Sequence, residues 1–361
     1  MLVCVGPGGV GKTTCSAAMG LRAAMDGKKV LVLTIDPARR LANSLGISAI
    51  GNTETRITDA SFRSARLSPK GQLWAMTLDM KLVWDDLVRR HAPSEKRRDQ
   101  ILGNRLYRQL STKLAGSLEY MAMEKLFELA QSRDYDLLVL DTPPTVHALD
   151  FLEAPNRLLD VLDNDAARWL LTPALAAGEI GLKFGSLGAS YVARTLAKFT
   201  GAQLLQELAQ FLVAFRGMYE GFKERATLVK ALLESEQTGF VLVTSPQTLA
   251  VDEAIFFARA LREEQIPMQA AIMNRVYPQQ TGAPSVATLR AAGVEETLAQ
   301  TLAQTAQDYA LLARADHAAQ LRLASVLGPE IPLHSIPRFV RDVHDLRGLW
   351  EVNEHLFGDS A

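Results

Sequence analysis

The chain has 361 residues, of which 48% are hydrophobic and 22% charged, a composition typical of a soluble globular protein with a sizeable core. Its 39 basic and 40 acidic residues give a formal net charge of -1, so no overall basic surplus favours nucleic acid or an anionic membrane. The two cysteines, Cys4 and Cys15, form no CxxC pair, and we expect them to be buried thiols in a reducing cytoplasm.

The N-terminal segment MLVCVG lacks the basic region and long apolar core of a signal peptide. It begins abruptly as a strand, so we expect a few residues to precede it in the natural protein. No window of about 18 residues is apolar without a charge, which argues against stable membrane insertion. We therefore predict a cytoplasmic protein.

Short apolar runs recur along the chain and predict the strands of one sheet. They are residues 1–5, 29–36, 73–79, 135–141, 238–245, 269–274 and 331–336. Continuous apolar runs without alternation are typical of parallel strands that helices cover on both faces. Helix-period segments between the runs complete a βαβ pattern, so we predict an α/β fold with a doubly wound, mostly parallel sheet.

The first predicted strand leads into GPGGVGKTT, residues 6–14, and a helix-like segment follows. A Gly-x4-Gly-Lys-Thr segment between a strand and a helix predicts a phosphate-binding loop. Because glycine has no Cβ, backbone N–H groups can converge on phosphate oxygens at the positive end of the helix. We expect this contact from Gly8, Gly9, Val10 and Gly11.

Side chains beside this loop and at two strand ends predict a site for ATP and Mg²⁺. We expect Lys12 to reach the β- and γ-phosphates, Thr13 to ligate Mg²⁺, and Thr14 to support the α-phosphate. Asp141 ends an apolar strand and is expected to hold the water shell of the metal. Asp36 ends another strand and is expected to orient the attacking water, since phosphoryl transfer depends mostly on positioning and charge.

Two long intervals interrupt the βαβ pattern, residues 80–133 and about 150–236. We predict that they form a helical subdomain on a single P-loop ATPase domain spanning residues 1–361. Insertions of this size usually carry partner-specific work. Their apolar stripes suit either a partner surface or the core of the subdomain itself. Near the C-terminus, residues 341–357 predict an amphipathic helix whose balanced charges differ from those of a basic membrane-targeting helix.

Four segments resemble one known family. They are GPGGVGKTT at 6–14, TIDPARRLANSLG at 34–46, LDTPPTVHALDFLEAPNRLLD at 140–160 and IMNR at 272–275. Their order and spacing are similar to those of the arsenite-pump ATPase ArsA and of the ATPase that guides tail-anchored membrane proteins. That family belongs to the deviant P-loop group, which also holds the ParA and MinD ATPases. The resemblance extends to the C-terminal segment IPLHSIPR and is faint in the helical insertions.

The resemblance implies a magnesium-dependent ATP hydrolase with a role for each matching residue. Asp36 corresponds to the aspartate of the first switch, which is implied to activate water. Asp141 corresponds to the aspartate of the second switch. Asn274 corresponds to the asparagine that reads adenine, and Pro337 with Arg338 lies where the family closes over the base.

The sequence also departs from the family pattern. Val146 replaces the second-switch glycine, and this replacement is expected to stiffen that loop. The next residue, His147, matches the family's histidine. The segment ending at Glu119 is only loosely similar to the family's PGxxE segment. The sequence has no CxxC to bind the zinc that joins the eukaryotic targeting dimer. It has no third cysteine for a metalloid site. It also carries one ATPase module, whereas ArsA has two.

The largest departure is Pro7, which replaces the signature lysine that crosses the family's dimer interface to the partner's nucleotide. Proline has neither an N–H group nor a charge. A cation supplied in trans to a transferring phosphate is worth about 10³ to 10⁵ in rate. Three interpretations stay open: a slow homodimer, a heterodimer whose related subunit keeps the lysine, or a substitute cation, for which Arg39 and Arg40 are the candidates.

The leading interpretation is an ATP hydrolase that acts as a nucleotide-switched dimer and binds a hydrophobic client or membrane-protein partner through its helical subdomain. The first alternative is an ATPase subunit that energises an anion transporter. The second is a ParA- or MinD-like positioning ATPase, which would need a basic surface that the sequence lacks. A scaffold that binds nucleotide without turnover also stays open, because Pro7 removes a catalytic charge.

Overall fold

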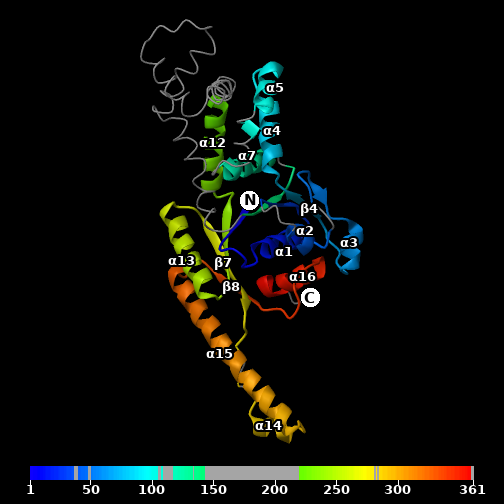
Figure 1. Ribbon diagram of the computed structural model, residues 1–361, viewed down its shortest axis with the longest axis vertical. Coiled ribbons are helices and arrows are strands. Elements are labelled where there is room, and N and C mark those ends of the chain that lie inside the picture. The colour runs from blue at the N-terminus through cyan, green and yellow to red at the C-terminus, as the bar shows by residue number, and fades with distance from the viewer. Residues whose placement is uncertain are drawn as a thin grey trace, which may run out of the picture. The chain divides into compact units, whose positions relative to one another are not determined.

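The computed structural model describes residues 1–35, 40–47, 50–104, 107–108, 117–132, 134–142, 219–279, 282 and 284–358, and Figure 1 labels their helices and strands. The strands are β1 (Leu2–Val5), β2 (Lys29–Thr34), β3 (Thr55–Arg56), β4 (Gln72–Thr77), β5 (Leu137–Asp141), β6 (Gly239–Thr244), β7 (Met268–Val276) and β8 (Leu333–Pro337).

The described helices include α1 (Lys12–Met25), α2 (Arg40–Ser44), α3 (Asp59–Ser64), α4 (Met80–His91), α5 (Glu95–Gly103), α7 (Ser117–Ser132) and α12 (Tyr219–Glu234). Toward the C-terminus follow α13 (Thr248–Glu263), α14 (Val286–Ala291), α15 (Glu296–Leu327) and α16 (Leu346–Phe357). None of these described helices is both long and apolar enough to cross a membrane.

One eight-stranded sheet holds the strands in the order β3-β4-β2-β5-β1-β6-β7-β8. Every neighbouring pair is parallel except β3 with β4. This confirms the predicted α/β fold with a mostly parallel sheet. Because β1 lies between β5 and β6, the carboxyl ends of the central strands meet around the loop that follows β1.

Helices cover both faces of the sheet, α1 and α16 on one and α13 with α15 on the other (Figure 1). Gly20 lets α1 approach β2 closely, because a Cβ at this position would overlap the side chain of Val32. The buried Asn353 of α16 donates from Nδ2 to the carbonyl oxygen of Ala18, 2.9 Å away. The last helix is therefore part of the packing that fixes α1 on the sheet.

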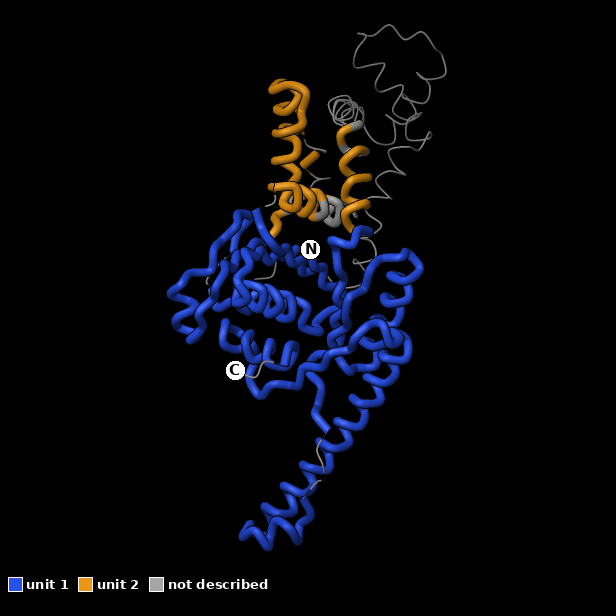
Figure 2. Tube along the Cα trace, turned by 180° about the vertical axis from the view of Figure 1, so that it is seen from behind, with its two compact units in different colours: residues 1–77, 133–149, 234–361 blue, residues 78–132, 150–233 orange. Residues whose placement is uncertain are grey.

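The chain divides into two compact units, coloured in Figure 2. Unit 1 comprises residues 1–77, 133–149 and 234–361 and contains the whole sheet. Unit 2 comprises residues 78–132 and 150–233, and its described part is helical. Most of the second predicted insertion lies outside the described residues.

Two buried polar groups link the helices of unit 2. The carboxylate of Asp85 accepts hydrogen bonds from the Tyr107 hydroxyl at 2.9 Å and from Lys81 Nζ at 2.6 Å. Glu124 of α7 forms an ion pair with Arg225 of α12. A buried charge is tolerated only when it is paired and hydrogen-bonded, so these contacts help to specify how the helices of this unit pack.

Candidate nucleotide-binding site

The loop between β1 and α1 needs glycine at two of its positions. Gly6 has φ 144° and Gly11 has φ 98°, conformations that favour glycine. A Cβ on Gly6 would overlap the backbone carbonyl oxygen of Val243 in β6, and a Cβ on Gly11 would overlap the amide of Asn274 in β7. The loop therefore passes tightly against the ends of both neighbouring strands.

Lys12 is the first residue of α1, and its side chain turns back over the loop. It is buried, and its Nζ donates to the carbonyl oxygens of Gly6 and Pro7, each at 2.8 Å. Pro7 thus contributes an acceptor to this loop even though it has no N–H to donate. The ammonium group lies beside the segment where the sequence predicts the phosphates of a nucleotide.

Three oxygen-bearing side chains meet where β2, β5 and α1 come together. Asp141, 1% exposed at the end of β5, accepts hydrogen bonds at Oδ2 from Thr13 at 2.6 Å and from Thr34 at 2.8 Å. Thr34 lies directly across from Asp141 in the parallel pairing of β2 and β5. Carboxylate and hydroxyl oxygens are the ligands that Mg²⁺ prefers, so this donor set fits the predicted metal.

The end of β7 provides two further contacts to the loop. Asn274 is buried, and its Nδ2 donates to the carbonyl oxygen of Val10 at 2.8 Å. The guanidinium of Arg275 donates from Nη1 to the carbonyl oxygen of Gly9 at 3.1 Å. Asn274 is among the site residues predicted from the sequence. Thr34 and Arg275 lie at the ends of two segments that resemble the family, but no role is predicted for either of them.

The turn after β8 lies beside the end of β7. Pro337 pairs with Val276, whose carbonyl oxygen accepts a hydrogen bond from the Arg338 backbone N–H at 2.9 Å. The Arg338 guanidinium lies 5.5 Å from the centroid of the Tyr277 ring. The structure therefore brings Pro337 and Arg338 to the same sheet edge as Asn274.

The remaining predicted site residues differ in what the structure says of them. Thr14 follows Thr13 within α1, and Arg40 begins α2 with an exposed side chain. Asp36, Arg39 and His147 lie outside the described residues. The predicted roles of all these residues in catalysis and nucleotide binding stay predictions.

The two cysteines flank the loop as buried, free thiols. Burial raises the pKa of Cys4 to about 12 and also raises the pKa of Cys15. Both groups are therefore protonated and weakly nucleophilic at neutral pH. Within the described part of the chain, no cluster of three or more His, Cys, Asp or Glu side chains could hold a metal ion.

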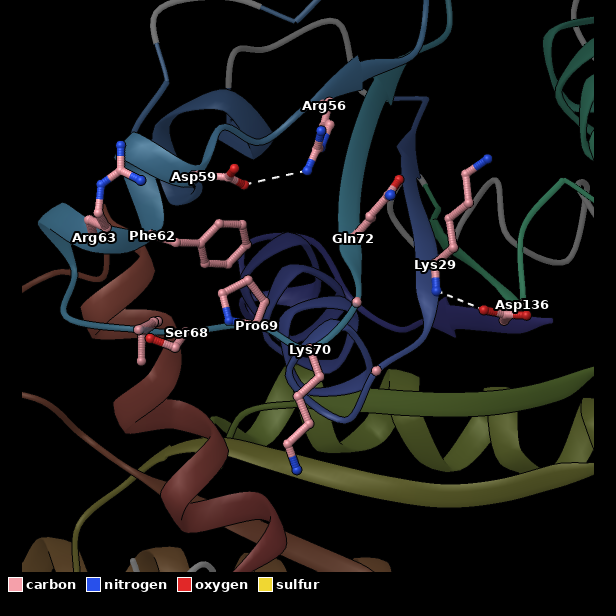
Figure 3. A pocket seen from close by; sticks show the side chains of 13 residues that line it. Lys29, Arg56, Asp59, Phe62, Arg63, Ser68, Pro69, Lys70, Gln72 and Asp136 are labelled. Carbon is pink, nitrogen blue, oxygen red and sulfur yellow. Dashed lines mark hydrogen bonds and ion pairs between the residues drawn. The ribbon is translucent and has the colours of Figure 1, made fainter.

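An open cavity of about 560 Å³ lies elsewhere in unit 1 (Figure 3). Its lining includes Lys29 and Gln72, which begin β2 and β4, and Asp136, which precedes β5. The side chains of Lys29, Arg63 and Lys70 extend in different directions rather than toward one point (Figure 3). Ligands of open α/β sheets bind at the carboxyl ends of the strands, whereas this cavity lies at the amino ends.

Comparison with known proteins gives a consistent assignment. A family model described as anion-transporting ATPase matches residues 1–309. The chain is 28% identical over 293 residues to the ATPase ARSA1 of Chlamydomonas reinhardtii. This match covers 75% of this chain and 34% of that protein. It is 25% identical over 294 residues to the ATPase GET3B of Arabidopsis thaliana, covering 76% of this chain and 63% of the relative.

A similar match links the chain to the ATPase get3 of Aspergillus terreus, with 27% identity over 276 residues, 75% of this chain and 71% of that protein. The chain thus spans about a third of the algal relative and less than two thirds of the Arabidopsis relative. Because the family model covers most of its length, the chain belongs to the anion-transporting ATPase family, whose members are ATPases.

Proposed function

We propose that the chain is a magnesium-dependent ATP hydrolase that changes state with its nucleotide, works as a dimer in the cytoplasm and binds a hydrophobic client or membrane-protein partner through unit 2. The observation that best supports ATP hydrolysis is the pair of hydrogen bonds that Asp141 Oδ2 accepts, from Thr13 at 2.6 Å and from Thr34 at 2.8 Å. They place a carboxylate and a hydroxyl side by side at the start of α1, as a Mg·ATP site requires.

Each loop residue has a role in this proposal. The N–H groups from Gly8 to Gly11 cradle the phosphates, which the positive end of α1 also attracts. Lys12 neutralises phosphate charge, and Thr13 with Asp141 holds Mg²⁺. When bound, Mg²⁺ would offset the negative charge that develops on the phosphates during transfer.

The base and the attacking water are assigned to other segments. Asn274, Pro337 and Arg338 are proposed to hold the adenine. This proposal is supported by the pairing of Pro337 with Val276, two residues after Asn274 in β7. Asp36 is proposed to activate the water, which rests on the sequence, because this residue lies outside the described part of the chain.

Replacing Asp141 by asparagine is expected to lower ATP turnover by about 10²-fold, because the variant loses the negative charge that holds the metal shell. Phosphate release should also require a higher Mg²⁺ concentration. Asp136→Asn is the matched control, since Asp136 stands just before the opposite end of the same strand, where it accepts from the Lys29 backbone N–H at 2.7 Å. Equal magnesium titrations for the two variants would refute the metal assignment.

The partner and the dimer can be tested on the purified full-length chain. Native purification in ATP and in ADP, followed by identification of bound proteins and measurement of the particle mass, should yield a dimer with a hydrophobic helical client in one nucleotide state. Protease cleavage within unit 2 should differ between the two states. A monomer with identical cleavage and no bound client in either nucleotide would contradict the switched carrier.

A second function is favoured by the description of the matching family model, anion-transporting ATPase. Here the chain would energise an anion transporter encoded separately. The described cysteines are buried and protonated, which disfavours a thiolate site for a metalloid and leaves other anions open. Stable co-purification with an integral membrane protein, together with ATP turnover that rises with the transported anion, would select this function over the client carrier.

A further inference from the structure

Two successive residues at the end of β7 bind two successive carbonyl groups of the loop. Asn274 Nδ2 donates to Val10 O at 2.8 Å, and Arg275 Nη1 donates to Gly9 O at 3.1 Å. The Asn274 side chain is itself held, because its Oδ1 accepts from the Arg275 backbone N–H at 2.9 Å. Both contacts therefore act on the part of the loop that is predicted to surround the phosphates.

Peptide geometry gives these contacts a consequence for the cradle. In a planar trans peptide the C=O and the following N–H point in opposite directions. Holding the carbonyls of Gly9 and Val10 on the β7 side therefore aims the N–H groups of Val10 and Gly11 away from β7. These are two of the N–H groups proposed to bind phosphate, so the pair on β7 sets their direction before any nucleotide binds.

The backbone at Arg275 supports a specific role. Three described non-glycine residues have positive φ: Arg66 (58°), Gln265 (56°) and Arg275 (63°). Arg66 and Gln265 directly follow the C-caps of α3 and α13, where a left-handed residue is routine. Arg275 instead lies inside a strand, where the pairing of β7 with β8 shifts register between Met273 and Val276.

Such an irregularity redirects a side chain and is frequent beside functional sites. A left-handed non-glycine residue is strained, and it persists only where its surroundings require it. At Arg275 the redirected side chain brings a permanently charged guanidinium from β7 to the loop that contains Pro7, where it donates to the Gly9 carbonyl oxygen.

We propose that Arg275 is a positioning residue of the phosphate loop: its guanidinium fixes the Gly9–Val10 peptide and places a positive charge beside a loop that lacks the signature lysine. This inference rests on the proposed binding of ATP. It assigns the compensating cation to β7, rather than to Arg39 or Arg40.

The test replaces Arg275 by glycine, which adopts a φ near 60° without strain and so preserves the strand. Equilibrium binding of ATP, ADP and GTP with Mg²⁺ would be measured for this variant, for Arg275→Lys and for the unmodified protein. Arg66→Gly is the matched control, since it makes the same substitution at an exposed arginine with φ 58°. Thermal unfolding without nucleotide checks that each variant is folded.

Arg275→Gly should unfold at or above the parental temperature, yet bind ATP and ADP about 10-fold more weakly, the usual effect of losing a hydrogen bond from a charged group. GTP binding should fall by the same factor, because a loop contact does not read the base. Arg275→Lys should recover most of the affinity, and Arg66→Gly should bind as the parent does.

Parental affinity of Arg275→Gly would overturn the inference while leaving the proposed ATPase intact. A loss confined to ATP and ADP would also overturn it, since it would make Arg275 a base contact. Absence of binding by the unmodified protein would contradict both proposals.

Discussion

Lys12→Met is expected to reduce ATP turnover by about 10² to 10³-fold, the effect of removing one preorganised donor from a site of developing charge. Lys12 is the buried cation whose Nζ already lies 2.8 Å from the Gly6 and Pro7 carbonyl oxygens. Methionine keeps the apolar stem and removes only the ammonium group. The measurement is phosphate release at saturating Mg·ATP, together with thermal unfolding in the presence and absence of Mg·ADP.

A nucleotide at 100 times its Kd stabilises the protein that binds it by about 2.7 kcal/mol. The parent should show this stabilisation, and Lys12→Met should lose most of it. The control is Lys28→Met, because Lys28 is an exposed lysine in the turn before β2. If Lys12→Met and Lys28→Met behave alike in both measurements, the loop does not hold phosphate.

Gly6→Ala should destabilise the protein by about 3–5 kcal/mol, through a strained backbone and an overlap with its neighbour. The neighbour is the Val243 carbonyl, which belongs to the β6 backbone and cannot rotate away as a flexible side chain could. The effect should appear in denaturant unfolding without any nucleotide, and it should abolish nucleotide binding in whatever protein remains folded.

Gly9→Ala isolates the backbone part of this effect. Gly9 also has positive φ, 76°, but a Cβ there would meet nothing within 4 Å. Gly9→Ala should therefore lower the free energy of unfolding by only about 1 kcal/mol, the usual penalty for a side chain at such a φ. Similar unfolding free energies for Gly6→Ala and Gly9→Ala would show that β6 does not confine the start of the loop.

The strands of the parallel sheet could be predicted because each contains an apolar run, and those at the centre of the sheet, such as β2 and β6, are buried almost throughout. The strand β3 could not, because Thr55–Arg56 is a two-residue, antiparallel addition without an apolar pattern. Helix-period segments indicated where helices lie, but the contact of Asn353 with α1 depends on tertiary packing and leaves no local signal.

The candidate site was predictable to the extent that one short motif encodes it. The loop residues and Lys12 follow from the spacing of the glycines, and Asp141 follows from its place at a strand end. Thr34 gains its role only through the register of β2 against β5, and Arg275 only through an irregular strand end. Such residues reach the site only because the fold brings separate segments together, and a single sequence does not record these contacts.

The two hydroxyls on Asp141 Oδ2 have a consequence for the order of events at this site. One carboxylate oxygen offers about two lone pairs, and here Thr13 and Thr34 each donate to that oxygen. A metal-bound water that hydrogen-bonds to Oδ2 would therefore compete with one of these two donors. If Thr34 loses its hydrogen bond to Oδ2, the change occurs at the last residue of β2, two positions before Asp36. Metal binding would then be linked, through this one oxygen atom, to the start of the predicted first switch segment.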